Sequence, residues 1–153
     1  MKILVTGGTG FIGSHTVVGL IGSGHDVVIA DNLINSKQEV VDRICKISGV
    51  KPPFYNMDVT DEKMREKLFE EQSIDGIIHF AGLKAVGESV SRPLDYYYNN
   101  ILSTIALSRM SLVHGVNKFV FSSSATVYGE QPSPLREDME LKPATNPYAE
   151  TKV

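Results

Sequence analysis

A glycine-rich stretch close to the N-terminus places the tightest constraint on what this chain can fold into. The apolar run at residues 2–6 leads directly into GGTGFIG (residues 7–13), and a helical pattern follows. Glycines at such a strand–helix junction permit a tight turn and a close approach of the backbone to a pyrophosphate, and Gly13 lets the helix pack on the strand. The free N–H groups at the start of the helix favour the phosphate charge. The stretch predicts a dinucleotide-binding turn, with a plain strand–helix turn as the alternative.

Short apolar runs alternate with longer helical patterns along the chain. Strands are expected at 2–6, 26–30, 53–56, 76–80 and 118–122. Helices are expected at 11–23, 37–48, 61–72 and 93–114. Most strand candidates are continuous apolar runs, which is typical of strands buried on both faces. The alternation predicts an α/β fold, a Rossmann-like doubly wound parallel sheet. Residues 130–147, with four prolines, are expected to form an ordered loop.

Composition excludes several classes of protein. Hydrophobic residues make up 42% of the 153, which is enough for a sizeable core, and the net charge of −3 gives no basic footprint for nucleic acid. The apolar runs are too short to span a bilayer, and no signal-peptide pattern is seen. The single cysteine, Cys45, fits a reducing compartment, and the four histidines lack ligand spacing. The sequence predicts a cytoplasmic protein with no metal, no nucleic-acid partner and no membrane contact.

Two aspartates follow predicted strands at positions that suit the adenosine half of a dinucleotide. Asp31 lies 18 residues after Gly13, where an acidic residue is expected to hydrogen-bond the ribose 2′-hydroxyl. A carboxylate there would repel a 2′-phosphate, and no Arg follows immediately, so NAD is favoured over NADP. Asp58, expected to end the third strand, is placed to reach the adenine. For both aspartates the alternative is a helix or turn cap.

The last residues of the chain hold a Tyr and a Lys four positions apart. Helical spacing puts Tyr148 and Lys152 on one face. A free Tyr titrates near ~10, so a neighbouring cation is needed before it can act as a base at neutral pH. Ser124 follows the fifth strand, on the side where doubly wound sheets bind ligands. Alone, the pair would be an ordinary solvated helix face; combined with Ser124 and the glycine-rich turn, it predicts proton transfer beside a nicotinamide. The tyrosines at 96–98 are expected to pack on a helix or in a subunit contact.

Five strings carry a resemblance to a known family. They are GGTGFIG (7–13), DNL (31–33), HFAGLKAVGES (79–89), FSSSATVYG (121–129) and YAETK (148–152). Over its whole length the chain resembles the N-terminal part of the UDP-glucose 4-epimerases, a family of extended short-chain dehydrogenases/reductases. The glycine-rich and YxxxK motifs define only that superfamily, whereas the strings at 79–89 and 121–129 point to the epimerases.

The resemblance implies a mechanism. NAD takes hydride from C4 of a UDP-hexose, the keto sugar turns over, and the hydride returns to its other face, so that UDP-glucose and UDP-galactose interconvert in galactose metabolism. Tyr148 would be the general base and acid, Lys152 would stabilise its phenolate and hold the nicotinamide ribose, and Ser124 would bridge the sugar 4-hydroxyl and Tyr148. Relatives that dehydrate nucleotide sugars carry acidic residues where this chain has Ala125 and Thr126, which argues against a dehydratase.

The resemblance also implies the contacts. The residues expected to bind NAD are Gly7, Gly10, Phe11, Ile12, Gly13, Asp31, Asn32, Asn35, Ser36, Asp58, Val59, Phe80, Ala81, Gly82, Lys84, Asn99, Ser122, Tyr148 and Lys152. Those expected to bind the UDP-hexose are Lys84, Ser124, Thr126 and Tyr148. The complete enzyme is expected to be a homodimer.

The resembled enzymes continue for about as many residues again, roughly one further domain. We therefore expect residues 1–153 to be a truncated NAD-binding Rossmann domain that lacks the substrate domain, with a sheet incomplete at its C-terminal end and no activity alone. The helix carrying Tyr148 and Lys152 would be short, and short terminal helices fray. Two alternatives stay open. One is another nucleotide-sugar epimerase or reductase, for example one acting on N-acetylated sugars, and the other is a non-catalytic NAD-binding module.

Overall fold

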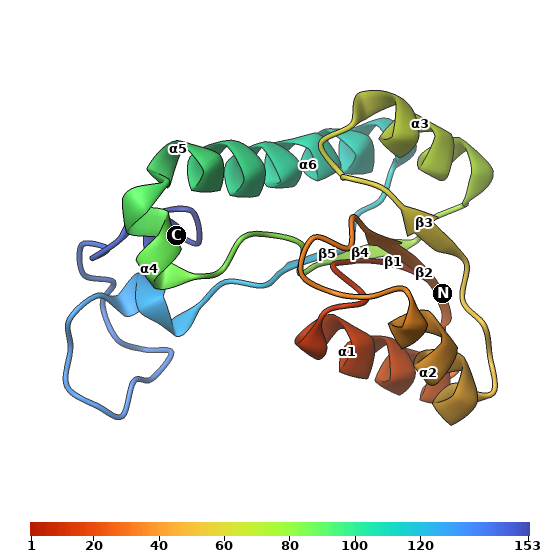
Figure 1. The fold of residues 1–153 in the computed structure, drawn as a ribbon, viewed down its shortest axis with the longest axis horizontal. Helices are drawn as coiled ribbons and strands as arrows, with labels where there is room; N and C mark the ends of the chain where they lie inside the picture. The colour runs from red at the N-terminus through yellow and green to blue at the C-terminus, as the bar shows by residue number, and fades with distance from the viewer. The chain divides into compact units, whose positions relative to one another are not determined.

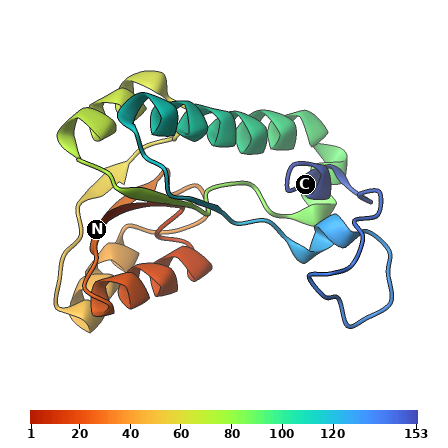
Figure 2. The same ribbon diagram turned by 180° about the vertical axis from the view of Figure 1, so that it is seen from behind.

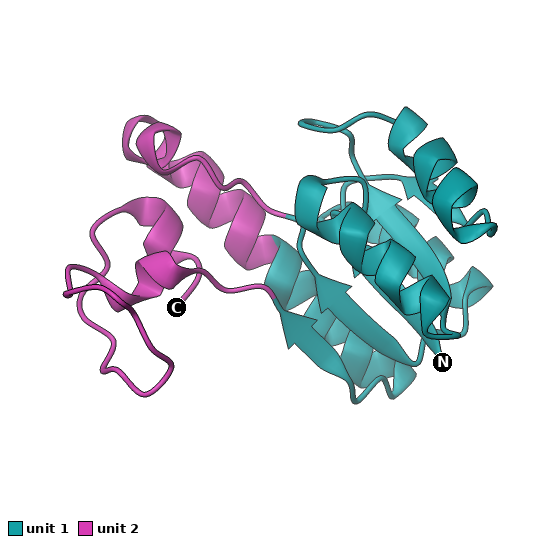
Figure 3. Cartoon of the chain, turned by 90° about the horizontal axis from the view of Figure 1, so that it is seen from below, with its two compact units in different colours: residues 1–81, 103–121 teal, residues 82–102, 122–153 magenta.

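The computed structural model describes all 153 residues, and the chain forms two compact units. Unit 1 comprises Met1–Ala81 and Ser103–Phe121, and unit 2 comprises Gly82–Leu102 and Ser122–Val153 (Figure 3). Unit 1 contains the whole sheet, whereas unit 2 is built from short helical segments and loops. The fold class expected from the sequence is therefore carried by unit 1.

Unit 1 is built around a five-stranded parallel sheet. The strands are β1 (Lys2–Thr6), β2 (Asp26–Asp31), β3 (Phe54–Asn56), β4 (Gly76–His79) and β5 (Phe119–Phe121), in the order β3-β2-β1-β4-β5. This is the order of the first five strands of the dinucleotide-binding Rossmann fold. All five predicted strands are confirmed, although β3 and β5 are shorter than expected because only three residues of each join the ladder. Thr6 pairs with Ala30 on one side and His79 on the other, so the carboxyl ends of β1, β2 and β4 lie at one edge.

Helices cover both faces of this sheet. Helices α1 (Phe11–Gly22) and α2 (Glu39–Ser48) lie on one face, and α3 (Glu62–Glu71) and α6 (Leu102–His114) lie on the other, as opposite views both show (Figures 1 and 2). The Asp61 carboxylate caps α3 by accepting a hydrogen bond of 3.0 Å from the Met64 N–H. None of the helices is both long and apolar enough to cross a membrane.

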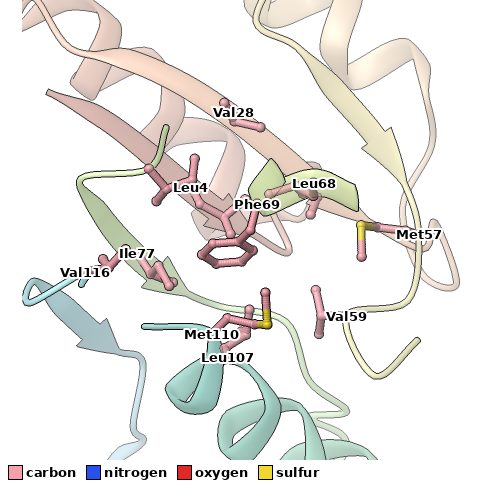
Figure 4. Packing of buried hydrophobic residues seen from close by; sticks show 12 residues of the cluster. Leu4, Val28, Met57, Val59, Leu68, Phe69, Ile77, Leu107, Met110 and Val116 are labelled. Atoms are coloured by element: carbon pink, nitrogen blue, oxygen red, sulfur yellow. The ribbon is translucent and has the colours of Figure 1, made fainter. Parts of the chain in front are cut away.

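Alternation along β1 and β2 divides the apolar residues of unit 1 into two cores. The core facing α1 and α2 contains Ile3, Val5, Val17, Val27, Ile29 and Ile44. The core facing α3 and α6 is larger and contains Leu4, Val28, Leu68, Phe69, Ile77, Leu107 and Met110, among others (Figure 4). Burying one such side chain fully contributes about 1.5–3 kcal/mol. Both faces of the sheet are therefore sealed, and polar groups gather at the edge where the strands end.

Unit 2 holds five short helical segments. They are α4 (Val86–Ser91), α5 (Pro93–Tyr96), the π-helical segment η1 (Tyr97–Ile101), the 3₁₀ segment η2 (Ala125–Tyr128) and α7 (Pro147–Glu150). The single helix predicted at 93–114 is interrupted, because one wide π turn separates α5 from α6. Such turns are often found at functional sites. Segments α4 and η2 were not predicted. In α4, Gly87 and β-branched Val86 and Val90 weaken the helical pattern.

Candidate functional site

Close packing of the backbone explains the glycine-rich turn between β1 and α1. Gly7 has φ +68°, its N–H donates to the Ala30 carbonyl at 2.9 Å, and its carbonyl accepts from the Gly10 N–H at 3.1 Å. A Cβ on Gly7 would lie 2.7 Å from the Ala81 nitrogen, and a Cβ on Gly13 would overlap the Gly7 carbonyl oxygen. Only glycine fits at these two positions without backbone movement. The turn therefore has the tight geometry predicted for it.

The start of α1 presents unpaired donors and exposed side chains. The first N–H groups of a helix have no intrahelical acceptor. No side chain caps this end, and no acidic residue lies in its first turn. Phe11 and Ile12, both expected to contact NAD, are 76% and 58% exposed. This end of α1 has the free donors and positive partial charge that suit a phosphate.

A buried polar pair holds the ends of β1 and β4 beside the turn. The Thr6 Oγ1 and His79 Nδ1 atoms lie 2.7 Å apart, and both residues are at most 1% exposed. His79 Nε2 lies 3.3 Å from Ser103 Oγ on α6, and Thr6 Oγ1 accepts from the Ala81 N–H at 3.4 Å. Sequence reasoning assigned neither Thr6 nor His79 a role, because a buried Thr–His pair has no local sequence signal.

The Asp31 carboxylate is bound to the turn as well as to its own loop. It is the last residue of β2 and is 8% exposed. Its Oδ2 accepts from the Thr9 N–H at 3.1 Å, and its Oδ1 accepts from the Leu33 N–H at 2.9 Å and the Ser36 hydroxyl at 3.2 Å. The turn-cap alternative therefore describes part of its role, since one carboxylate orders both the loop and the glycine-rich turn.

A groove between α1 and α2 adjoins this carboxylate loop. Its volume is about 590 Å³, and it is lined by four residues expected to bind NAD: Gly10, Phe11, Asn35 and Ser36. Lys37 and Arg43 add positive charge to the lining, and Glu39 adds negative charge. The structure thus brings the expected turn residues and loop residues to one concave surface.

Asp58 is a turn cap. Strand β3 ends at Asn56, so Asp58 lies two residues beyond the strand and not at its end as expected. It accepts from the Thr60 hydroxyl at 2.6 Å, the Thr60 N–H at 2.8 Å and the Asn32 amide at 3.1 Å. Burial opposes its ionisation, but these hydrogen bonds outweigh burial and hold its pKa below the ordinary value.

Two residues expected to contact NAD, Val59 and Phe80, direct their side chains to the hydrophobic cores. Val59 is 6% exposed and belongs to the larger core, and Phe80 packs against the core that faces α1 and α2. Only backbone atoms of Val59 are therefore available for the cofactor contact expected of it.

Unit 2 brings Tyr148 and Lys152 together. Tyr148 lies in α7 and is 9% exposed, while Lys152 follows the helix in a turn and is 6% exposed. The Lys152 Nζ donates to the Ser122 carbonyl oxygen at 3.1 Å and lies 6.0 Å from the centre of the Tyr148 ring. Burial lowers the pKa of the Lys152 ammonium. A cation held beside a phenol is the arrangement that stabilises a phenolate.

The end of the chain is docked, in contrast to the frayed helix expected from its length. The Asn146 side chain caps α7 by accepting from the Ala149 N–H at 2.9 Å. The Thr151 hydroxyl donates to the Tyr148 carbonyl at 2.8 Å, and the Ser123 hydroxyl donates to the Lys152 carbonyl at 2.8 Å. Two local hydrogen bonds within the segment and the long-range hydrogen bond from Ser123 thus replace the helix length that the segment lacks.

Asn100 links this terminal segment to the loop after β4. The residue is 2% exposed, and its Oδ1 accepts from the Leu83 N–H at 2.8 Å. Its Nδ2 donates to the Leu83 carbonyl and to the Thr151 hydroxyl, both at 2.9 Å. A Cβ on Gly82 would lie 3.0 Å from Asn100 Oδ1 and 3.6 Å from Lys152 Nζ. Asn99, the neighbouring residue expected to bind NAD, is half-buried, and its sequence context does not distinguish it from Asn100.

Replacing Asn100 with alanine is expected to lower the free energy of unfolding by about 2–4 kcal/mol, because the buried Thr151 hydroxyl and both backbone groups of half-buried Leu83 lose a partner. Urea unfolding measures the loss, and amide exchange at Thr151 reports whether the terminal segment opens. Asn99→Ala is the matched control, with a much smaller loss expected. Equal effects of the two substitutions would contradict the role given to Asn100.

Tyr96 packs against Tyr148 and stays neutral. The two rings meet edge to face with centres 6.5 Å apart, and Tyr96 is 1% exposed. Its hydroxyl donates to Glu88 Oε2 at 2.7 Å and accepts from the Ala85 N–H at 3.1 Å. Burial, together with the Glu88 hydrogen bond, raises its pKa to about 12. Tyr96 therefore supports the Tyr148 ring and is not itself a base at neutral pH.

The remaining predicted residues of unit 2 are more dispersed. Ser124 Oγ accepts from the Thr126 N–H at 3.3 Å and the Thr126 hydroxyl at 3.0 Å, so it caps η2, and no hydrogen bond joins it to Tyr148. Lys84 is exposed. No group of three or more His, Cys, Asp or Glu side chains is arranged to hold a metal ion.

The buried position of Lys152 has a consequence for stability. Because its pKa is lower in the folded chain, the unfolded chain binds more protons between that value and the ordinary value of 10.5. Stability should therefore rise as pH increases through this window. Lys152→Met is expected to leave the free energy of unfolding at pH 7 unchanged or to increase it. The substitution should also remove the rise of stability with pH. Urea unfolding at pH 7 and pH 10 tests this prediction, with Lys118→Met as the control at an exposed lysine. The prediction would be contradicted if the difference in the free energy of unfolding between Lys152→Met and the unsubstituted chain were the same at both pH values.

The sheet order, the glycine-rich turn and the acidic end of β2 together define a Rossmann-like dinucleotide-binding protein. The profile of the NAD dependent epimerase/dehydratase family matches residues 3–153, and the chain belongs to that family. It is 53% identical over 152 residues to the UDP-glucose 4-epimerase of Neisseria meningitidis serogroup C, a match that covers 99% of this chain. The resemblance stated from the sequence is confirmed.

Solved structures agree with this assignment. The crystal structure of UDP-glucose 4-epimerase from Bifidobacterium longum in complex with NAD+ and UDP matches with a TM-score of 0.96 and 46% identity, over 99% of this chain and 46% of that one. The UDP-Glc/GlcNAc 4-epimerase of Campylobacter jejuni matches with a TM-score of 0.90 and 38% identity, over 99% of this chain and 45% of that one. The chain spans about 45% of the length of the Neisseria relative.

Proposed function

We propose that residues 1–153 are the NAD-binding part of an enzyme that interconverts UDP-glucose and UDP-galactose, a reaction of galactose metabolism. The single observation that carries the proposal is the docked pair of Tyr148 and Lys152, which forms in a chain that also has a dinucleotide-binding turn. The similarity to UDP-glucose 4-epimerases over 99% of the chain supports it. Unit 1 would supply the pyrophosphate and adenosine contacts, and unit 2 the groups that act on the sugar.

The residues present fit NAD. The positions of Gly7 and Gly13 leave no room for a Cβ, which is the property a pyrophosphate cradle needs. The N–H groups at the start of α1 would bind the phosphates, and Asp31 would accept from the adenosine ribose. When bound, NAD supplies reversible hydride transfer at C4 of the hexose. Gly10, Phe11, Asn35 and Ser36 would line its path, since they already share one groove.

Tyr148 would take the proton of the sugar 4-hydroxyl and later return it. A phenol with a pKa near ~10 needs a nearby cation to act as a base at neutral pH. Lys152 supplies that cation at the Tyr148 ring, and the Ser122 carbonyl fixes its position. Tyr96 holds the ring from the side as a neutral phenol. Ser124, Thr126 and Lys84 are proposed as contacts of the UDP-hexose.

The activity test uses a hybrid polypeptide in which residues 1–153 are followed by the C-terminal part of the Neisseria relative. We expect the hybrid to convert UDP-galactose to UDP-glucose. The UDP-glucose formed is measured in a coupled assay with UDP-glucose dehydrogenase. We expect the 153-residue chain alone to bind NAD without turnover, because it supplies under half of its relatives' length. A folded hybrid that binds NAD and acts on no UDP-hexose would contradict the proposal.

A second candidate is an epimerase that also accepts N-acetylated UDP-hexoses. It is favoured by the match to the Campylobacter jejuni enzyme, which is named for both kinds of sugar. The same assay with UDP-N-acetylgalactosamine distinguishes the two candidates.

We also propose that the protein is a cytoplasmic homodimer. In unit 2, Leu94 of α5 and Tyr98 and Ile101 of η1 are 79%, 69% and 40% exposed. Exposed apolar side chains this close in sequence suit a protein partner. The single cysteine fits a reducing compartment. Sedimentation of the hybrid should give a dimer that Tyr98→Glu dissociates; a monomer at micromolar concentration would contradict this.

A further inference from the structure

Three polar side chains of unit 1 close into a ring that the proposed function leaves unexplained. Thr9 lies in the glycine-rich turn, Asp31 ends β2, and Ser36 lies in the loop that follows. Thr9 Oγ1 and Ser36 Oγ are 2.7 Å apart, the Ser36 hydroxyl donates to Asp31 Oδ1 at 3.2 Å, and the Thr9 N–H donates to Asp31 Oδ2 at 3.1 Å. Thr9 is only 3% exposed, so its hydroxyl faces the ring and not solvent.

The chemistry of the groups fixes the direction of the hydrogen bonds. An ionised carboxylate only accepts, whereas each hydroxyl has one proton to donate. The Ser36 hydroxyl must therefore donate its hydrogen bond to Asp31, and the Ser36 oxygen must accept a hydrogen bond from the Thr9 hydroxyl. The two hydroxyls form a chain that runs from Thr9 through Ser36 and ends on the carboxylate.

Counting acceptor positions shows what this chain leaves available. A carboxylate offers about four lone-pair positions. The Leu33 N–H and the Ser36 hydroxyl fill those on Oδ1, and the Thr9 N–H fills one on Oδ2. One position remains, on Oδ2. The carboxylate is thus held from both oxygens and can accept one further hydroxyl.

We propose that Thr9 and Ser36 are positioning residues that fix the Asp31 carboxylate to accept a single ribose hydroxyl and to reject a 2′-phosphate. The inference rests on the proposed function, because it takes an adenosine ribose as the ligand of Asp31. A carboxylate bound at three points cannot rotate away from a second anion, so like-charge repulsion persists. Thr9 acts only through Ser36 and Asp31, since its hydroxyl is buried.

The test measures preference for NADH over NADPH by titrating each into the 153-residue chain and following nicotinamide fluorescence. The unsubstituted chain is expected to prefer NADH at least tenfold. Thr9→Val removes the buried hydroxyl but keeps the backbone N–H, and should reduce this preference about three- to tenfold, the worth of roughly one hydrogen bond. Ser36→Ala should do the same. The double variant should lose no more than the larger single loss, because both act on one carboxylate.

Controls separate a positioning role from a general loss of structure. Thr9→Ser keeps the hydroxyl and should retain the preference. Thr16→Val makes the Thr-to-Val change within α1, where the hydroxyl bonds only the Ile12 carbonyl. If Thr9→Val fails to fold by circular dichroism, the ratio of NADH to NADPH affinity in Ser36→Ala decides, because loss of a direct Ser36 contact in the groove would weaken both dinucleotides alike. An unchanged preference in the folded variants, or additive losses in the double variant, would overturn this inference alone. No NADH binding by the unsubstituted chain would overturn the proposed function and this inference with it.

Discussion

Gly13→Ala is expected to weaken NAD binding by the 153-residue chain at least tenfold and to destabilise its fold by about 1–3 kcal/mol, the usual cost of overpacking. The new methyl group would overlap the Gly7 carbonyl oxygen. Relief requires α1 to move away from the turn, and this movement takes the N–H groups of the helix out of line with the phosphates.

A second glycine of the same helix provides the matched control. A Cβ on Gly19 would meet no atom within 4 Å. Gly19→Ala should leave NAD binding unchanged and raise stability by about 0.5–1 kcal/mol, as expected for alanine in a helix interior. Calorimetric titration and urea unfolding measure both quantities. Indistinguishable behaviour of the two variants would show that close packing at Gly13 does not matter for the cofactor.

Tyr148→Phe is expected to lower turnover of the hybrid polypeptide by about 10²–10⁴-fold, the usual contribution of a general acid–base group. Phenylalanine keeps the ring that packs edge to face against Tyr96, so the fold and NAD binding should be preserved. The loss should therefore appear in kcat and not in the affinity for the cofactor. The coupled assay measures turnover, and calorimetry measures NAD binding.

Tyr98→Phe is the control for this substitution, because Tyr98 is 69% exposed in the 153-residue chain and phenylalanine keeps the apolar ring offered to the proposed dimer partner. Its turnover should stay within about twofold of the unsubstituted hybrid, because the substitution removes only an exposed hydroxyl. If Tyr148→Phe retained a tenth or more of the activity, another group would have to be the base.

The parts of the fold that could be predicted from sequence are those with local causes. Mostly continuous apolar runs marked the five strands, and the glycines at 7–13 marked the turn, because burial and backbone space leave a direct trace in residue type. Strand ends were less certain. Asp58 was expected at the end of β3 and lies two residues beyond it, where the ladder has already stopped.

Only the residues of the site that belong to a sequence motif could be predicted. Tyr148 and Lys152 lie close together as their spacing indicated. Their support comes from residues distant in sequence: Asn100 reaches Thr151 across 51 positions, and Ser123 reaches Lys152 across 29. Side-chain partners of this kind carry no periodicity, so the docked end of the chain, the neutral Tyr96 and the Thr9–Asp31–Ser36 ring emerged only from the structure.

Calorimetric titration of NAD+ and NADP+ into the 153-residue chain tests whether residues 1–153 form an NAD-binding unit. We expect saturable one-site binding of NAD+ and at least tenfold weaker binding of NADP+, because the fixed Asp31 carboxylate repels the extra phosphate. A folded chain that binds neither dinucleotide, or that binds NADP+ as tightly as NAD+, would contradict it.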